Sequence, residues 1–155
     1  MGNIKITSPS FSEGEEIPDK FTCNGENINP ELDIENIPKN TKSLFLIVDD
    51  PDAPTGTFVH WILFNLPVKI LENMDNKIPE DYSSESPVVE GKNDFGSRGY
   101  GGPCPPSGTH RYFFKAYALN DTLDLNESVS KEEVEKAMED KILDSGQLKG
   151  VYSKK

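Results

Sequence analysis

The chain has only two histidines, His60 and His110, and each follows a loop rich in proline and glycine. The first loop, DDPDAPTG, also carries Asp50, and the second, GGPCPPSGT, leads into His110 and Tyr112. Proline fixes φ and glycine permits unusual φ values, so both loops should hold a defined shape. Imidazole, carboxylate and phenol groups that meet in one place can bind an anion, ligate a metal ion or move a proton.

Short apolar segments separated by turn residues must position these side chains. They span residues 3–6, 43–50, 58–67, 111–119 and 147–153. Strand-length segments between Gly, Pro and Asn loops predict a mainly β protein with an antiparallel β-sandwich. Because neighbouring antiparallel strands end at a common rim, both histidines, an aspartate and a tyrosine hydroxyl can converge there on a shallow pocket.

One segment, residues 130–146, has a helical pattern. Ser130 and Glu133 form a capping box, and Gly146 is placed to end the helix. Its apolar stripe, which predicts packing on the sandwich, consists of Val134, Ala137, Met138 and Ile142. Residues 72–100 are polar and interrupted by Pro and Gly, so they predict a long loop over one end of the sandwich.

Composition predicts a single domain over residues 1–155. The net charge of −11 argues against a nucleic-acid partner and against an anionic membrane surface, since both require a basic face. The apolar runs are too short for membrane insertion, and the first residues lack a basic and then apolar leader. We therefore expect a cytoplasmic protein.

Simpler interpretations apply to each candidate residue. A histidine beside an aromatic strand is more often a packing or hydrogen-bonding residue than a ligand-binding one. Asp-Pro-Asp usually builds a turn, and Tyr112 fits a core position. Arg111 is expected to form a structural ion pair with one of the aspartates. A functional site is favoured because both histidines follow unusually rigid loops.

Two motifs, DPDAPTGTFVHWILFNLP and NDFGSRGYGGPCPPSGTHRYFFKAYAL, resemble the phosphatidylethanolamine-binding protein family. The NDFG and GY elements resemble its bacterial and archaeal branch, often called Raf kinase inhibitor-like proteins. The segment SPSFSEGEEIPDKFTCNGENINPEL and the C-terminal GQLKGVYSK resemble the same branch, so nearly the whole chain is covered.

The resemblance implies a β-sandwich with a small pocket for phosphate-type anions or phospholipid head groups. The ligand-binding residues that it implies are Asp50, His60, Gly102, Pro105, His110 and Tyr112. The supporting residues are Asp52, Pro54, Pro106 and Arg111. It also implies a cis peptide bond between Ala53 and Pro54. A bare carboxylate would repel an anion, so Asp50 is expected to orient a histidine.

The predicted function is binding without catalysis and without a metal or other cofactor, because no nucleophile motif or phosphate loop occurs. The expected partner is a small phosphorylated or anionic ligand; an unidentified protein partner and a homodimer remain compatible with the sequence. One alternative is a metal-dependent enzyme that uses Asp50, His60 and His110. The other is an interaction or inhibitor module that binds through residues 72–100 and has a vestigial pocket.

The two cysteines, Cys23 and Cys104, lie in turn-like segments and form no CxxC motif. A reducing compartment favours free thiols. The resemblance, however, brings both turns to the rim of the pocket, so a disulfide or a redox-active thiol pair stays open.

Overall fold

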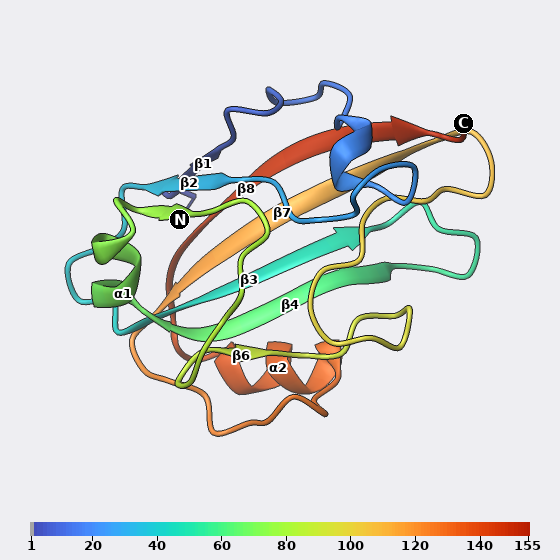
Figure 1. The fold of residues 1–155 in the computed structure, drawn as a ribbon. Helices are drawn as coiled ribbons and strands as arrows, with labels where there is room; N and C mark the ends of the chain where they lie inside the picture. Colours follow the sequence, from blue (N-terminus) through green and yellow to red (C-terminus); the bar gives the residue numbers. More distant parts are fainter. Residues whose placement is uncertain (1) are drawn as a thin grey trace.

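The computed structural model describes residues 2–155, which form two antiparallel β-sheets (Figure 1). The larger sheet has five strands in the order β6-β4-β3-β7-β8. These strands are β3 (Ser43–Asp50), β4 (Phe58–Pro67), β6 (Val89–Glu90), β7 (Thr109–Leu119) and β8 (Ile142–Ser153). The smaller, three-stranded sheet is ordered β1 (Lys5–Thr7), β2 (Leu32–Glu35) and β5 (Lys77–Ile78). The predicted mainly β, antiparallel fold is confirmed.

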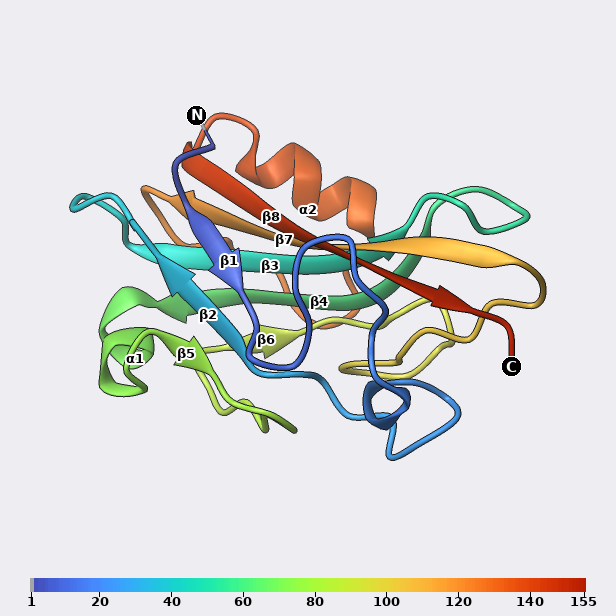
Figure 2. The ribbon, with the colours of Figure 1, turned by 90° about the horizontal axis from the view of Figure 1, so that it is seen from above.

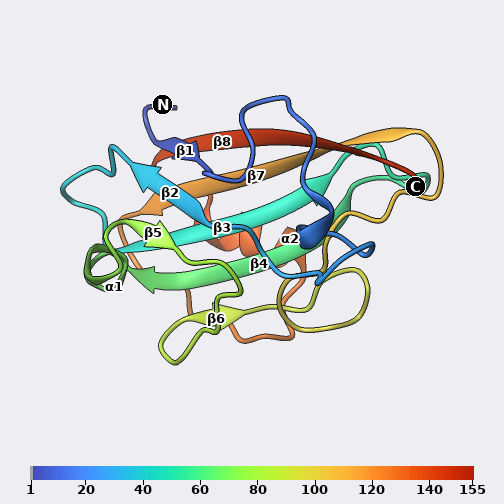
Figure 3. The ribbon, with the colours of Figure 1, turned by 45° about the horizontal axis from the view of Figure 1, so that its top comes forward.

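The central strand β3 is buried at every position because both faces of the large sheet are covered. Leu46 and Val48 belong to a core between the two sheets, whereas Phe45 and Ile47 belong to a second core under a helix. Figures 2 and 3 show β1 and β2 crossing one face of the large sheet, with α2 on the opposite face. This double coverage explains why the segment SLFLIVDD lacks the apolar and polar alternation of a half-exposed strand.

The helix α2 (Lys131–Met138) begins with the predicted capping box. The Ser130 side chain accepts the Glu133 backbone N–H, and the Glu133 carboxylate accepts the Ser130 N–H. Val134 and Met138 are buried in the core on this side of the sheet. The prediction of a helix that packs on the sandwich is therefore confirmed.

The predicted end of this helix at Gly146 is wrong. Residues from Ile142 onward form β8, which pairs along β7, and Ile142 reaches the helix core from the strand. Gly146 lies so close to the Ile4 carbonyl that a Cβ atom would collide with it. This glycine therefore permits close packing of the N-terminal segment and does not cap a helix.

The outer side of β8 is paired with residues near the N-terminus. Gly14 donates to the Lys149 carbonyl, Ile17 donates to the Val151 carbonyl, and Val151 donates back to Glu15. In Figure 1, the chain that follows β1 runs beside β8, so this edge of the large sheet is covered.

The segment 72–100 contains more structure than predicted. Its strand β5 pairs with β2 in the small sheet, and β6 pairs with β4 in the large one. Two other short elements, α1 (Val68–Asn73) and the 3-10 helix η1 (Asp19–Phe21), were not expected either. Within residues 2–155, no helix is long and apolar enough to cross a membrane.

Candidate functional site

A cavity of about 240 Å³ opens at the end of the large sheet where β3 finishes and where β4 and β7 begin. The antiparallel order of these strands brings Asp50, His60 and His110 to the same rim, as the strand pattern predicts. The cavity is lined by Asp50, Ala53, Pro54, Thr55, Phe58, His60, Phe95, Cys104, Pro105, Pro106, His110 and Tyr112.

His110 is held by Asp50. Its Nδ1 lies 2.6 Å from Asp50 Oδ2, and both side chains are almost completely buried. A carboxylate accepts hydrogen bonds, so this Nδ1 carries the proton and Nε2 is left for another partner. The second Asp50 oxygen accepts the Asp52 backbone N–H at 2.7 Å. Asp50 thus orients the ring and also closes the turn after β3.

His60 reaches the cavity because of an irregularity in β4. Val48 pairs with Trp61 and Asp49 pairs with Val59, so His60 is an extra residue between two pairs, as in a β-bulge. Trp61 belongs to the core between the sheets, and His60 lines the cavity on the same side of the sheet. The bulge thereby places two successive side chains on one face.

The His60 ring is fixed by a backbone carbonyl. Nδ1 lies 2.7 Å from the Gly101 oxygen, which can only accept, so Nδ1 carries the proton in the neutral ring. Burial lowers the His60 pKa below 6.5, with the bond to Gly101 acting in the opposite direction. His60 is therefore a neutral imidazole at pH 7, with Nε2 as its acceptor atom.

Tyr112 completes the polar floor of the cavity. Its ring lies edge-on to His60, with 5.2 Å between the ring centroids. Burial, reinforced by Asp50, raises the pKa of the Tyr112 hydroxyl well above its usual value. The hydroxyl therefore stays protonated and can donate a hydrogen bond to a ligand.

Three of the residues implied by the resemblance do not line the cavity. Gly102 is buried beside the Phe21 backbone, donates its N–H to Asn27 Oδ1 at 2.8 Å, and has no room for a Cβ atom. Its place in the structure is the packing of the loop behind the cavity. The other two, Asp52 and Arg111, lie outside the cavity and contact each other.

Arg111 forms the expected ion pair. Its guanidinium makes two contacts of 2.9 Å with the Asp52 carboxylate, which also accepts the Arg111 backbone N–H. The Arg111 side chain lowers the pKa of Asp52 to about 2. The pair ties the turn after β3 to the start of β7.

The implied cis bond between Ala53 and Pro54 is not present. Within residues 2–155, the one cis bond precedes Pro87. The turn is closed instead by the Asp52 N–H on Asp50, by the Gly56 N–H on the Ala53 carbonyl, and by the positive φ of Gly56. These features reverse the chain with a trans bond, which is the lower-energy isomer.

Cys23 and Cys104 are joined by a disulfide, with their Cα atoms 5.5 Å apart. The structure thus differs from the free thiols that the compartment argument favours. Cys104 lines the cavity, and Cys23 donates its backbone N–H to the Pro103 carbonyl. The disulfide fixes one wall of the cavity to the N-terminal segment.

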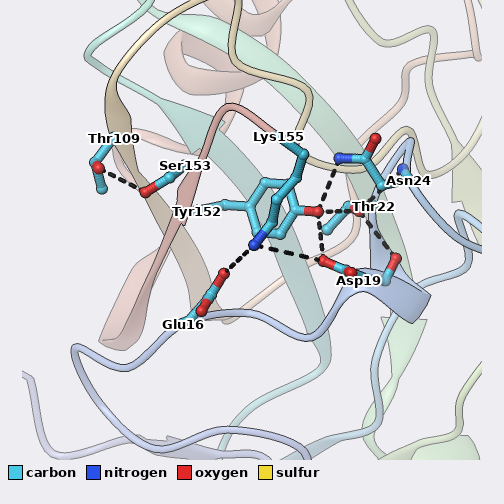
Figure 4. A network of polar contacts seen from close by, with 8 residues as sticks. All are labelled: Glu16, Asp19, Thr22, Asn24, Thr109, Tyr152, Ser153 and Lys155. Atoms are coloured by element: carbon cyan, nitrogen blue, oxygen red, sulfur yellow. Dashed lines mark hydrogen bonds and ion pairs between the residues drawn. The ribbon is translucent and has the colours of Figure 1, made fainter.

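A polar network around Tyr152 holds that segment against β8. Figure 4 shows the buried Tyr152 hydroxyl accepting from Thr22 at 3.0 Å and from Asn24 at 2.8 Å while it donates to Asp19 at 2.6 Å. Tyr152 pairs directly with His110 across β7 and β8, so both side chains lie on one face of the sheet. The network therefore lies beside the site and supports the loop that carries Cys23.

Sequence reasoning missed the aromatic part of the cavity. Phe58 and Phe95 line it, and their ring centroids lie 4.8 Å apart. Phe95 belongs to the NDFG motif, which indicated a branch of the family but did not indicate a role for this phenylalanine. Phe58 precedes His60 by two residues, so strand alternation could have placed both on the cavity side.

The alternative of a metal site at Asp50, His60 and His110 finds no support in the geometry. Within residues 2–155, no group of three or more His, Cys, Asp or Glu side chains is arranged to hold one ion. Both oxygens of Asp50 already accept hydrogen bonds within the protein, one from His110 Nδ1 and one from the Asp52 N–H.

Comparisons with known proteins agree with this architecture. Residues 7–153 match the profile of the family described as phosphatidylethanolamine-binding protein. A UPF0098 protein of Pyrococcus abyssi is 49% identical, over 98% of this chain and 86% of the relative. The crystal structure of a phosphatidylethanolamine-binding protein homolog from Chlamydia trachomatis, CT736, superposes with a TM-score of 0.89 at 38% identity and covers 100% of both chains.

YbcL of E. coli, described as a member of the mammalian PEBP family, has a TM-score of 0.89 at 29% identity, over 99% of this chain and 100% of its own. These similarities span the motifs around both histidines, and the solved structures share the complete fold. The chain therefore belongs to the phosphatidylethanolamine-binding protein family.

Proposed function

We propose that the cavity binds small phosphate-type anions, or the phosphoryl head groups of lipids, without catalysing a reaction on them. The observation that supports this most strongly is the convergence of His60, His110 and Tyr112 on one cavity in an otherwise acidic protein. Hydrogen bonds from charged donors to an anion are among the strongest in proteins.

The protonation of the site determines which anions fit. Both histidine Nδ1 atoms are engaged, so each Nε2 faces a ligand either as an acceptor or, when the ring is protonated, as a cationic donor. Tyr112 supplies a hydroxyl donor in either state. A monohydrogen phosphate can donate its own proton to one Nε2 while it accepts from Tyr112, so binding does not require two imidazolium ions.

The proposal includes no covalent step. Cys104 is the one thiol-derived group in the cavity wall, and it is part of the disulfide. Asp50 lines the cavity, but one of its oxygens is bonded to His110 and the other to the Asp52 N–H, so both oxygens already have donors within the protein. The carboxylate and imidazole pair thus acts in positioning and charge balance.

An NMR titration with inorganic phosphate and with phosphoethanolamine tests this function. At about pH 6, we expect backbone shifts at the cavity loops and a loss of affinity of about tenfold or more in His60→Gln and His110→Gln. Lys115→Gln, on the opposite face of the sheet, is the matched control and should change affinity by less than about twofold.

Two outcomes would overturn the proposal. Phosphate could leave the cavity resonances unmoved, or the histidine variants could bind it as tightly as the native chain. If the variants retained binding of a protein partner through residues 72–100, the interaction-module alternative would gain support instead.

A further inference from the structure

The mouth of the cavity carries an exposed aromatic side chain that the anion site does not require. Among residues 2–155, Phe95 is the one large hydrophobic side chain left exposed, with 51% of its surface accessible. An isolated exposed hydrophobic residue needs no explanation by itself. This one, however, lines a cavity and stands beside one of its histidines.

The loop that carries Phe95 is fixed in place. Asn93, itself 4% exposed, accepts the N–H groups of Phe95 and Ser97 and donates to the Gly99 carbonyl. Asp94 is bonded to Val59 of β4 in both directions, through its backbone N–H and through its carboxylate. The ring is therefore presented by a hydrogen-bonded turn and does not belong to a loose segment.

The ring is also seated on one side. Its centroid lies 4.8 Å from that of Phe58 and 5.4 Å from that of His60, both edge-on. A Cβ atom on Gly101 would come within 2.5 Å of Phe95 Cδ2, so the glycine makes room for the ring. One flank of Phe95 thus packs on the protein, and the remainder is open to a ligand.

The cavity is consequently layered. The residues Asp50, His60, His110 and Tyr112 line it and are buried, so they form a polar floor. The mouth consists mainly of apolar residues that are partly or fully exposed, namely Pro54, Phe58, Phe95 and Pro106. A bare phosphate would use only the floor. An anion that carries an apolar, planar substituent would use both layers and would cover Phe95.

We propose that Phe95 is a specificity-determining residue and that the preferred ligand is an anion attached to an apolar planar group, as in an aryl phosphate. This inference rests on the proposed function of the cavity. Aromatic contacts of this kind change affinity by about threefold to tenfold beyond simple burial. Phe95 should therefore discriminate between ligands that share the same anionic group.

Calorimetric titrations with four probes test the inference: inorganic phosphate, phenyl phosphate, butyl phosphate and phosphocholine. For each probe, the ratio of the native affinity to the variant affinity is compared, so that differences in probe charge cancel. Phe95→Ala should weaken phenyl phosphate by about tenfold and leave inorganic phosphate within about twofold. Phe113→Ala removes an aromatic ring from the opposite face and should change neither value.

A second variant separates the aromatic contact from local packing. Phe95→Leu keeps an apolar side chain on Phe58, so it should retain butyl phosphate but still weaken phenyl phosphate by about threefold. Unchanged binding of phenyl phosphate in both variants would overturn the inference. An equal loss for phenyl phosphate and inorganic phosphate would also overturn it.

The remaining outcomes are equally decisive. If phosphocholine binds as tightly as phenyl phosphate and depends on Phe95, the ring recognises a cation and the assignment to an apolar group is wrong. If inorganic phosphate binds but phenyl phosphate binds no better, the proposed role of Phe95 is wrong, while the proposed anion site is still supported. If neither phosphate nor phenyl phosphate binds the native protein, the proposed function itself fails.

Discussion

The last two residues of β3 face opposite sides of the large sheet and have different surroundings. On the side that carries α2, Asp49 contacts the Lys115 ammonium at 3.2 Å, and Lys115 and Arg111 both lie near the Phe113 ring. On the other side, Asp50 is bonded to His110 inside the cavity.

On the helix side, each of these cations has a carboxylate partner within the protein, so the charges serve the fold. On the cavity side, within the described chain, the Nε2 atoms of both histidines have no protein hydrogen-bond partner. The polar residues on the two faces therefore differ in whether their hydrogen-bonding atoms are already paired within the protein. Unused polar atoms beside a cavity, more than the number of charges, distinguish a binding face from a structural one.

Among the predicted changes, removal of the disulfide should have the largest effect on the stability of the cavity side of the sheet. Cys23→Ser combined with Cys104→Ser should lower the free energy of unfolding by about 4 kcal/mol, because the bond links residues 81 positions apart. Urea unfolding of the oxidised protein and of the double variant measures this difference.

Reductant provides the control for the disulfide. It should destabilise the oxidised protein and leave the double serine variant unchanged. Two free thiols, counted in denatured protein that was protected from oxidation, together with equal stability of both proteins, would show that the wall does not depend on this bond.

The pH dependence of stability tests whether His60 is a buried, neutral imidazole. The unfolded chain binds a proton near pH 6.5, while burial lowers the pKa of His60 in the folded state. The unfolded state therefore holds more protons just below pH 6.5, and stability should fall as the pH decreases, by at most about 1.4 kcal/mol per pH unit for one proton. His60→Gln should flatten this dependence between about pH 7 and 5.

Saturating sulfate, which keeps its charge over this range, should oppose the loss by favouring the protonated ring. Denaturant unfolding at several pH values, with and without sulfate, provides the measurement. The same slope in the native protein and in His60→Gln would contradict a buried neutral imidazole.

The ion pair outside the cavity should give the smallest effect. In Arg111→Met, the Asp52 carboxyl should titrate closer to its usual value of 3.8 than to about 2. A lowered carboxyl pKa adds stability above pH 3.8 that is lost as the pH falls through about 2, so the two proteins should converge in strong acid. NMR titration of Asp52 measures this pKa. An unchanged titration midpoint in Arg111→Met would show that Arg111 does not cause the lowered pKa of Asp52.

Strands with apolar residues at nearly every position were predictable from sequence. The segments 43–50 and 58–67 match β3 and β4. Both faces of the large sheet are covered, so these strands are buried on both sides and need no alternation of apolar and polar residues. The end of α2 was not predictable, since Gly146 is required by a contact with Ile4 far away in the sequence. The two-residue strands β5 and β6 carry no local pattern at all.

The candidate site was predictable in its polar floor and not in its mouth. Rigid loops and strand order bring Asp50, His60, His110 and Tyr112 to one cavity, as expected. The bulge at His60 depends on pairing with β3, and the position of Phe95 depends on the Asn93 turn and on Gly101. Local sequence specifies neither of these arrangements without the tertiary partners.

The covering of β8 by the N-terminal segment also bears on self-association. A sheet edge with free N–H and C=O groups is a template for strand addition by another chain. Here, Gly14, Ile17 and Glu15 already occupy backbone groups of Lys149 and Val151 along one edge, and the strand at the other edge, β6, is two residues long. Edge-to-edge growth through the large sheet is therefore disfavoured.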